Sequence, residues 1–227
     1  MKLGCFLNRC LPPQYQVLIG GFAIQLVLGT LYCWGNLTTY ITSYLRQLNP
    51  ELTYSDTLLV YASIIGTQAL CMWAGGMVEE KLGPGLTTFL GGSILCGGII
   101  LSSLTTSLLG FVTLYGVCFG LGLALAYPCP LSCGFHWMPR HKGLVSGFIV
   151  SGFGGGPFVF NQVATRLVNP RDAPASEVGA DGRLYYGPEV ADRVPAMLRT
   201  LGAGYFALVL LGALALRDPP ARRRRRR

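Results

Sequence analysis

The chain has 227 residues, of which 51% are hydrophobic and only 12% are charged. Soluble domains carry about twice that share of charged residues, so the composition excludes an ordinary water-soluble domain. The 31 glycines are scattered through the apolar runs rather than gathered in linkers. Because glycine lets helices approach closely in lipid, the composition predicts an all-α polytopic membrane protein in a lipid bilayer.

The formal net charge of +8 does not indicate a nucleic-acid partner. Six of the eighteen basic residues form the run Arg222–Arg227, and no basic helix face with interleaved aromatic residues is present. His136 and His141 lack further ligands for a metal ion. Most of the eight cysteines read as buried, inert thiols, while Cys5 and Cys10 leave palmitoylation open. We expect no nucleic acid, metal or cofactor.

Six segments are apolar enough, and near or above the roughly 20 residues needed, to cross a bilayer as helices. In chain order they are Tyr15–Tyr44, Thr57–Val78, Leu86–Thr106, Leu109–Met138, Leu144–Thr165 and Ala196–Leu216. The chain therefore divides into an N-terminal segment (1–14), a transmembrane bundle (15–216) and a basic tail (217–227). One long polar connection (166–195) lies between the last two spans.

The distribution of basic residues predicts the orientation, because cytoplasmic loops carry an excess of Lys and Arg. A cytoplasmic N-terminus places twelve bases inside: Lys2, Arg9, Lys81, Arg140, Lys142, Arg217 and Arg222–Arg227. The outer side then holds six: Arg46, Arg166, Arg171, Arg183, Arg193 and Arg199. We expect a multi-pass membrane protein with both termini in the cytoplasm, while the membrane of residence stays open.

Charged residues are nearly absent from the six segments, with Arg199 as the one exception. A charge at mid-membrane costs at least about 2.5–3.5 kcal/mol and is usually kept for a function. The segments thus contain neither a carboxylate relay for protons nor the acid, base and nucleophile of an intramembrane hydrolase. The sequence predicts a protein that is not an enzyme.

The connection GGMVEEKLGPG (75–85) is the first motif with a particular spacing. It resembles the G-x-x-x-D-R-x-G signature between the second and third helices of major facilitator superfamily transporters. On this resemblance Gly76, Glu80, Lys81 and Gly83 form a motif that locks and releases the cytoplasmic ends of the helices. The chain departs from the signature in having Glu for Asp and an extra acid at Glu79.

The run from Tyr115 to Asn161 resembles the oxalate–formate antiporter branch of the same superfamily. That branch carries a glycine-rich fourth helix ending in Tyr-x-x-Pro, then Trp-Phe-Pro with two bases and Gly, and then a Gly-rich fifth helix. The matching residues here are Tyr127, Pro130, Trp137, Pro139, Arg140, Lys142, Gly143 and Gly152–Phe158. Pro139, Arg140, Lys142 and Gly143 also suit a tight cytoplasmic turn between two helices.

The resemblance implies six helices like the N-terminal half of a twelve-helix fold, with substrate bound between two halves. It implies a secondary transporter of small carboxylates such as oxalate, formate or other monocarboxylates. Val117 or Gly116 stands where the superfamily has a proton-coupling Arg, which favours exchange or facilitated diffusion. In the fifth segment Gly152, Gly156 and Pro157 predict close helix packing and a kink, as in antiporters or as a packing face without a transport role.

The polar and aromatic residues of the spans are the candidate substrate contacts. Amide and hydroxyl groups can donate hydrogen bonds to a carboxylate without placing a charge in the membrane. The candidates are Gln25, Tyr32, Trp34, Asn36, Gln68, Tyr127 and Asn161. Hydrogen bonds between helices are the alternative role for each of them.

The chain ends where the central loop of the superfamily would begin, so we expect a truncated half. A half-size protein that dimerises and an inactive remnant are the alternatives. The expected partner is therefore a second six-helix half or a second copy. A non-transporting protein that pairs with a full-length transporter and regulates it is the competing functional hypothesis.

Overall fold

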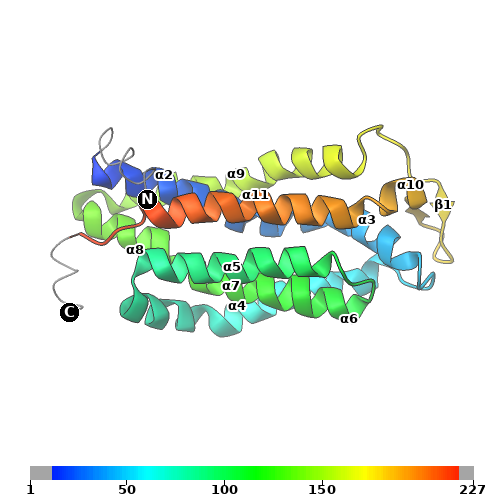
Figure 1. Cartoon of the computed structure of the whole chain (residues 1–227), viewed down its shortest axis with the longest axis horizontal. Helices are drawn as coiled ribbons and strands as arrows, with labels where there is room; N and C mark the ends of the chain where they lie inside the picture. Colours follow the sequence, from blue (N-terminus) through cyan, green and yellow to red (C-terminus); the bar gives the residue numbers. More distant parts are fainter. Residues whose placement is uncertain (1–11, 220–227) are drawn as a thin grey trace.

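The computed structural model describes residues 12–219 and contains six helical segments long and apolar enough to cross a membrane. The prediction of an all-α polytopic membrane protein is confirmed. Cys5, Cys10, Lys2, Arg9 and the run Arg222–Arg227 lie outside the described residues. The helices run side by side along the long axis of the molecule (Figure 1).

Some of the six spans are single helices and others are assembled from shorter pieces. The first span (Pro13–Arg46) comprises α2 (Pro13–Leu28), η1 (Gly29–Cys33) and α3 (Trp34–Arg46). The second and third are α4 (Tyr54–Leu82) and α5 (Pro84–Ser102). The fourth (Leu108–Trp137) comprises α6 (Leu108–Gly110), η2 (Phe111–Val117), α7 (Cys118–Ala126) and α8 (Pro128–Trp137).

The fifth span (Pro139–Val168) consists of η3 (Pro139–His141) and α9 (Lys142–Val168). The sixth (Pro188–Ala215) consists of α10 (Pro188–Ala191) and α11 (Val194–Ala215). Between the last two spans the structure forms a two-stranded antiparallel hairpin of β1 (Glu177–Val178) and β2 (Leu184–Tyr185). The long connection is therefore shorter than expected, because α9 continues to Val168 and α10 begins at Pro188.

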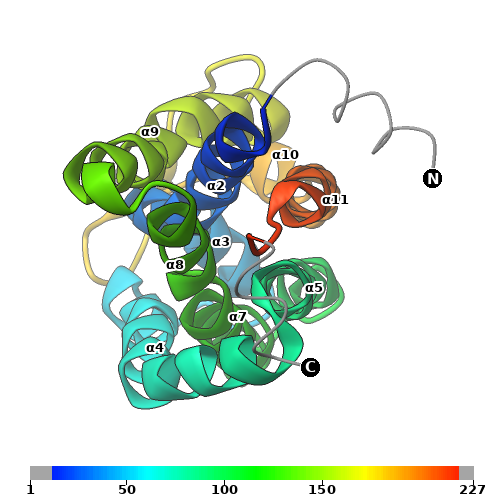
Figure 2. The same ribbon diagram turned by 90° about the vertical axis from the view of Figure 1, so that its left-hand side faces the viewer.

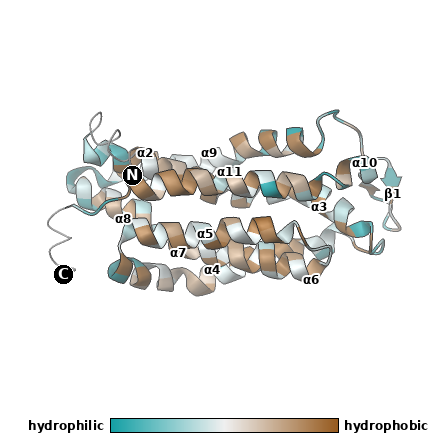
Figure 3. Ribbon diagram, in the orientation of Figure 1, coloured by the Kyte–Doolittle hydropathy of each residue, from teal (hydrophilic) through white to brown (hydrophobic). Residues whose placement is uncertain are grey.

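The two ends of the bundle differ in what they hold (Figure 1). At one end, here named the α8 end, lie the start of α2, the α4–α5 turn, the α8–α9 turn and the end of α11. At the other, here named the hairpin end, lie α10 and the β1–β2 hairpin. Hydrophobic residues cover the length of the helices, whereas hydrophilic residues gather towards the ends (Figure 3).

Viewed from the α8 end, the helices form a ring (Figure 2). In it α11 packs between α2 and α5, α7 packs against α5 and α4, and α9 packs against α2. The core between them contains fully buried side chains such as Ile24, Leu95 and Phe119. The spans that contain α4 and α9 have the smallest share of buried residues within the described structure.

Glycines permit the close approach of α5 and α7. A Cβ at Gly91 would lie 2.7 Å from the Gly122 carbonyl oxygen, and a Cβ at Gly122 would collide with the Gly91 carbonyl. Larger residues would therefore push the two backbones apart, as expected for helix packing in lipid. This contact places α7 in the interior, with α4 on its other side.

The tight turn between α4 and α5 depends on Gly83. Its φ of 87° lies in the region that residues with a side chain rarely adopt. Pro84 follows as the first residue of α5, a position at which the fixed φ of proline suits a helix start. The turn thus reverses the chain within one residue and brings the end of α4 close to the start of α5.

Candidate substrate pocket

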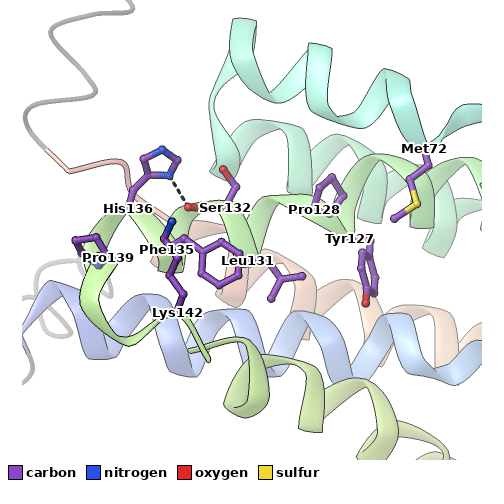
Figure 4. A pocket seen from close by; sticks show the side chains of 9 residues that line it. All are labelled: Met72, Tyr127, Pro128, Leu131, Ser132, Phe135, His136, Pro139 and Lys142. Carbon is purple, nitrogen blue, oxygen red and sulfur yellow. Dashed lines mark hydrogen bonds between the residues drawn. The ribbon is translucent and has the colours of Figure 1, made fainter. Parts of the chain in front are cut away.

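An open pocket lies at the α8 end between the second, fourth and fifth spans (Figure 4). Its volume is about 620 Å³. It is lined by Met72 of α4, by Tyr127 and Pro128, Leu131, Ser132, Phe135 and His136 of α8, and by Pro139 and Lys142. The size falls within the range of pockets for small organic ligands.

The pocket combines apolar walls with a few polar groups, which is the usual character of a small-molecule site. Met72 and Leu131 contribute apolar surface, and Tyr127 contributes a hydroxyl group. Lys142 extends from the start of α9 towards α8 in the close-up view (Figure 4). A small anion with an apolar part would fit this chemistry, because the Lys142 ammonium and the Tyr127 hydroxyl can donate hydrogen bonds to it.

Next to the pocket, Phe153 contacts two tyrosines, Tyr127 and Tyr32. The ring of Phe153 lies edge-on to Tyr127 at 5.5 Å and edge-on to Tyr32 at 5.6 Å between ring centroids. On the other side, the Gln25 side chain donates a long hydrogen bond of 3.5 Å to the Tyr127 carbonyl oxygen. The structure thus brings Gln25, Tyr32 and Tyr127 together around Phe153 and the first, fourth and fifth spans.

Gln25 is fully buried, and its Oε1 atom has no hydrogen-bond partner. An unsatisfied buried polar atom costs about 1–3 kcal/mol, so it calls for a reason. Among the predicted contacts, two other side-chain atoms are buried without a hydrogen-bond partner: Oδ1 of Asn161 in α9 and Nε1 of Trp34 in α3. The Trp34 indole packs against Tyr115 with ring centroids 5.3 Å apart, away from the pocket.

The other two predicted contacts lie elsewhere. The Asn36 side chain donates a hydrogen bond of 3.1 Å to the Thr165 hydroxyl, so it joins the first span to the fifth. Gln68 is half-buried on α4, where its backbone nitrogen would lie 3.2 Å from a Cβ placed at Gly120. Of the seven predicted contacts, Tyr127 is the one that lines the pocket.

The predicted loop motifs sit at the α8 end. Glu80, Lys81, Arg140, Lys142 and Gly143 are exposed there, and Gly76 has open space around it. Pro139 starts η3 and, like Lys142, lines the pocket. The adjacent acid Glu79 differs from Glu80, since it is buried.

The predicted packing residues of α9 face α2. A Cβ at Gly152 would lie 2.5 Å from the Phe22 carbonyl oxygen, and a Cβ at Gly156 would collide with the Leu26 carbonyl. Pro157 lies inside α9, which continues as one helix on both sides of it. These residues therefore set the distance between the first and fifth spans beside Phe153.

Four of the pocket residues follow from helical spacing that the sequence already contains. Leu131 and Phe135 lie four and eight residues after Tyr127, and Ser132 and His136 follow Pro128 at the same spacing. Residues four apart share one face of a helix, so Tyr127 could have pointed to Leu131 and Phe135. Met72 carries no such signal, because its place depends on how α4 packs against the fourth span.

Within residues 12–219 no group of three or more His, Cys, Asp or Glu side chains is placed to hold a metal ion. The Nδ1 atom of His136 makes a hydrogen bond of 2.5 Å with the Ser132 carbonyl oxygen, which orients its ring at the pocket edge. The described cysteines are free thiols, and Cys33, Cys96, Cys129 and Cys133 among them are buried.

Comparisons with known proteins point to membrane carriers. No protein-family profile matches the chain. The chain is 34% identical to apicoplast pyruvate carrier 1 of Toxoplasma gondii over 89% of its own length and 45% of that carrier. It is 29% identical to human monocarboxylate transporter 12, over 66% of this chain and 30% of that transporter. It is 27% identical to the uncharacterized MFS-type transporter YhjX of Escherichia coli, over 69% of this chain and 39% of that protein. The chain spans less than half the length of these curated relatives, and its homologues include MFS-type transporters.

Proposed function

We propose that this chain contributes six spans to a secondary transporter of small monocarboxylates such as pyruvate. The single observation that carries the proposal is the open pocket of about 620 Å³, which joins apolar walls to the Tyr127 hydroxyl group and the Lys142 ammonium group. Pyruvate has a carboxylate for the polar groups and a methyl group for the apolar walls. A site of this kind suits alternating access, in which the pocket opens to one side of the membrane at a time.

The names of the relatives support the same substrate class. They include a pyruvate carrier and a monocarboxylate transporter, and each aligns with most of this chain. Transport by exchange, as the resemblance to oxalate–formate antiporters implies, is part of the proposal. We further propose that the α8 end faces the cytoplasm, because the positive-inside rule places Lys81, Arg140 and Lys142 there.

Counterflow in vesicles tests the transport proposal. The protein, expressed from its complete coding sequence, is reconstituted into proteoliposomes loaded with unlabelled pyruvate, and labelled pyruvate is added outside. We expect transient accumulation of label inside the vesicles. Efflux that requires a carboxylate on the opposite side indicates exchange, and efflux without one indicates facilitated diffusion. Folded protein that moves no mono- or dicarboxylate contradicts the proposal and favours a non-transporting membrane protein.

A pocket-filling variant links transport to the site. Leu131→Trp adds bulk inside the pocket, so we expect it to abolish counterflow without loss of folded protein. Leu101→Trp is the matched control, since Leu101 is 49% exposed on α5 and does not line the pocket. Equal transport by the two variants would separate the activity from this pocket.

A further inference from the structure

Two adjacent acids, Glu79 and Glu80, lie near the end of the second span and differ in burial. Glu79 is 4% exposed, whereas Glu80 is exposed. The spacing of the superfamily signature matches Glu80, so the buried acid is the one that the signature does not assign. Burial of a carboxylate is costly unless hydrogen bonds compensate for lost water.

The helical phase of α4 explains why Glu79 is the buried acid. The buried residues of this helix are Thr57, Val60, Ile64, Gly75 and Glu79. Their spacings of three, four and eleven residues return to one face of an α-helix, and this face packs on η2 and α7. At Gly75 a Cβ would collide with the Ala124 carbonyl of α7. One turn further, Glu79 must therefore point into the same interface, while Glu80 lies about 100° around the helix.

A hydrogen bond connects Glu79 to the fourth span. The Ser132 hydroxyl of α8 donates to the Glu79 Oε1 atom over 2.8 Å. Ser132 also lines the pocket, and its carbonyl oxygen bonds to the His136 ring. The carboxylate thus holds a residue of the pocket wall from outside the pocket, since Glu79 itself is not among the lining residues.

We propose that Glu79 is a positioning residue, which fixes the α8 wall of the pocket to the second span through the Ser132 hydroxyl. This inference rests on the proposed transport function. It assigns to Glu79 a role that differs from that of Glu80: Glu79 shapes the pocket within the six-helix unit, and Glu80 stays at the surface. Loss of the bond lets α8 shift and weakens substrate binding more than it slows transport.

The test compares variants of Glu79 and Ser132 in the protein expressed from its complete coding sequence. Glu79→Leu removes the acceptor, and Ser132→Ala removes the donor. We expect each to raise the KM for pyruvate about three-fold, the size of a typical hydrogen bond between membrane helices, with a smaller change in the maximal rate. Glu79→Gln keeps an acceptor oxygen, so it should restore most of the lost affinity. A variant that only misfolds would lower the rate and the amount of protein without this change in KM.

A second readout does not depend on transport. The melting temperature of the purified protein in detergent should fall by a few degrees in Glu79→Leu and in Ser132→Ala, and the double variant should fall by less than the sum. Ser93→Ala is the matched control, because the Ser93 hydroxyl donates within its own helix, α5, to the Phe89 carbonyl. Additive shifts, or equal effects of Glu79→Leu and Glu80→Leu on KM, overturn the inference. A different outcome is that the unaltered protein does not transport pyruvate, while the falls in melting temperature of the two single variants still exceed that of the double variant when summed. This outcome overturns the proposed function and leaves the role of Glu79 standing.

Discussion

The Arg46 guanidinium lies over the ring of Tyr185, with Cζ 3.9 Å from the ring centroid. Tyr54 stacks on the same tyrosine at 4.6 Å between centroids, and the Arg183 guanidinium lies 6.0 Å from the Tyr54 ring. The end of the first span, the start of the second and the β1–β2 hairpin are therefore joined by one stack of two rings and two cations. Tyr185, the last residue of β2, is only 1% exposed.

Removing the cation from this stack should loosen the hairpin. Arg46→Gln loses the contact with Tyr185, and a partly desolvated cation–π contact contributes about 1–2 kcal/mol. We expect faster proteolysis within residues 171–187, measured on the protein in detergent or vesicles. Arg171→Gln is the control, since Arg171 is exposed on the same connection. Equal cleavage rates in the two variants would show that the stack does not hold the hairpin.

The hairpin should also respond to alkaline pH. Burial, together with the nearby Asp181 carboxylate that accepts its hydroxyl hydrogen bond, raises the pKa of Tyr185 to about 12. The folded hairpin thus holds this proton more tightly than the unfolded chain, whose tyrosines titrate near pH 10. The contribution of protonated Tyr185 to the stability of the hairpin is therefore fully present below about pH 10 and is lost as the pH rises towards 12.

The measurement is a phenolate titration by ultraviolet absorbance. Because the pKa of Tyr186 is also raised to about 12, Tyr185→Phe should lose one phenol's share of the late-titrating absorbance and keep the rest. At acidic pH, the same hydrogen bond lowers the pKa of Asp181. The contribution of the Asp181 carboxylate to stability is therefore present above about pH 4 and is lost as the pH falls through this lowered pKa. A Tyr185→Phe protein with an unchanged titration curve would contradict this assignment.

The contact between α2 and α9 predicts a contrast between two glycines of one helix. Gly156→Ala places a methyl group against the Leu26 carbonyl, whereas Gly154 has open space around it. We expect Gly156→Ala to lower stability by about 1–3 kcal/mol through overpacking and Gly154→Ala to have little effect. Melting temperatures of the two variants, prepared side by side, decide this, and similar values would place the helices further apart than described.

Gln25 offers a test that separates a structural role from binding. Its Oε1 atom is buried without a partner, and its Nε2 atom donates only the long bond of 3.5 Å to the Tyr127 carbonyl, so Gln25→Met should leave stability nearly unchanged. If the amide contacts substrate next to Tyr127, the same variant should raise the KM for pyruvate several-fold. Parallel measurements of melting temperature and counterflow give the answer. A stable variant with normal KM would remove Gln25 from the substrate contacts.

Tyr127 provides the complementary case, because its ring lies in the pocket. Tyr127→Phe keeps the edge-on contact with Phe153 and removes only the hydroxyl group. We expect a higher KM for pyruvate at an unchanged maximal rate. Tyr15→Phe, at a 49% exposed position near the start of α2, is the control. A KM unaffected in both variants would show that the Tyr127 hydroxyl does not bind the carboxylate.

Helical spacing from Tyr127 already contains Leu131 and Phe135, so part of the pocket wall could be predicted from the sequence. The interrupted helices were harder to predict. Phe111–Val117 forms a π-helical stretch and Gly29–Cys33 a 3-10 stretch, although the apolar pattern of the first and fourth spans runs straight through both. These local changes follow contacts with other helices, such as the approach of Phe153 to Gly29, and a single segment does not contain that information.

The six spans were determined by the sequence alone, because a backbone in lipid must satisfy its hydrogen bonds internally and about 20 apolar residues then suffice to form a crossing helix. Tertiary structure decided which residues these helices bring together. A rotation of 100° separates buried Glu79 from exposed Glu80, and the packing of Gly75 against Ala124 sets that rotation. The stack of Arg46 on Tyr185 likewise joins residues 139 positions apart, and such distant contacts arise only when the helices have assembled.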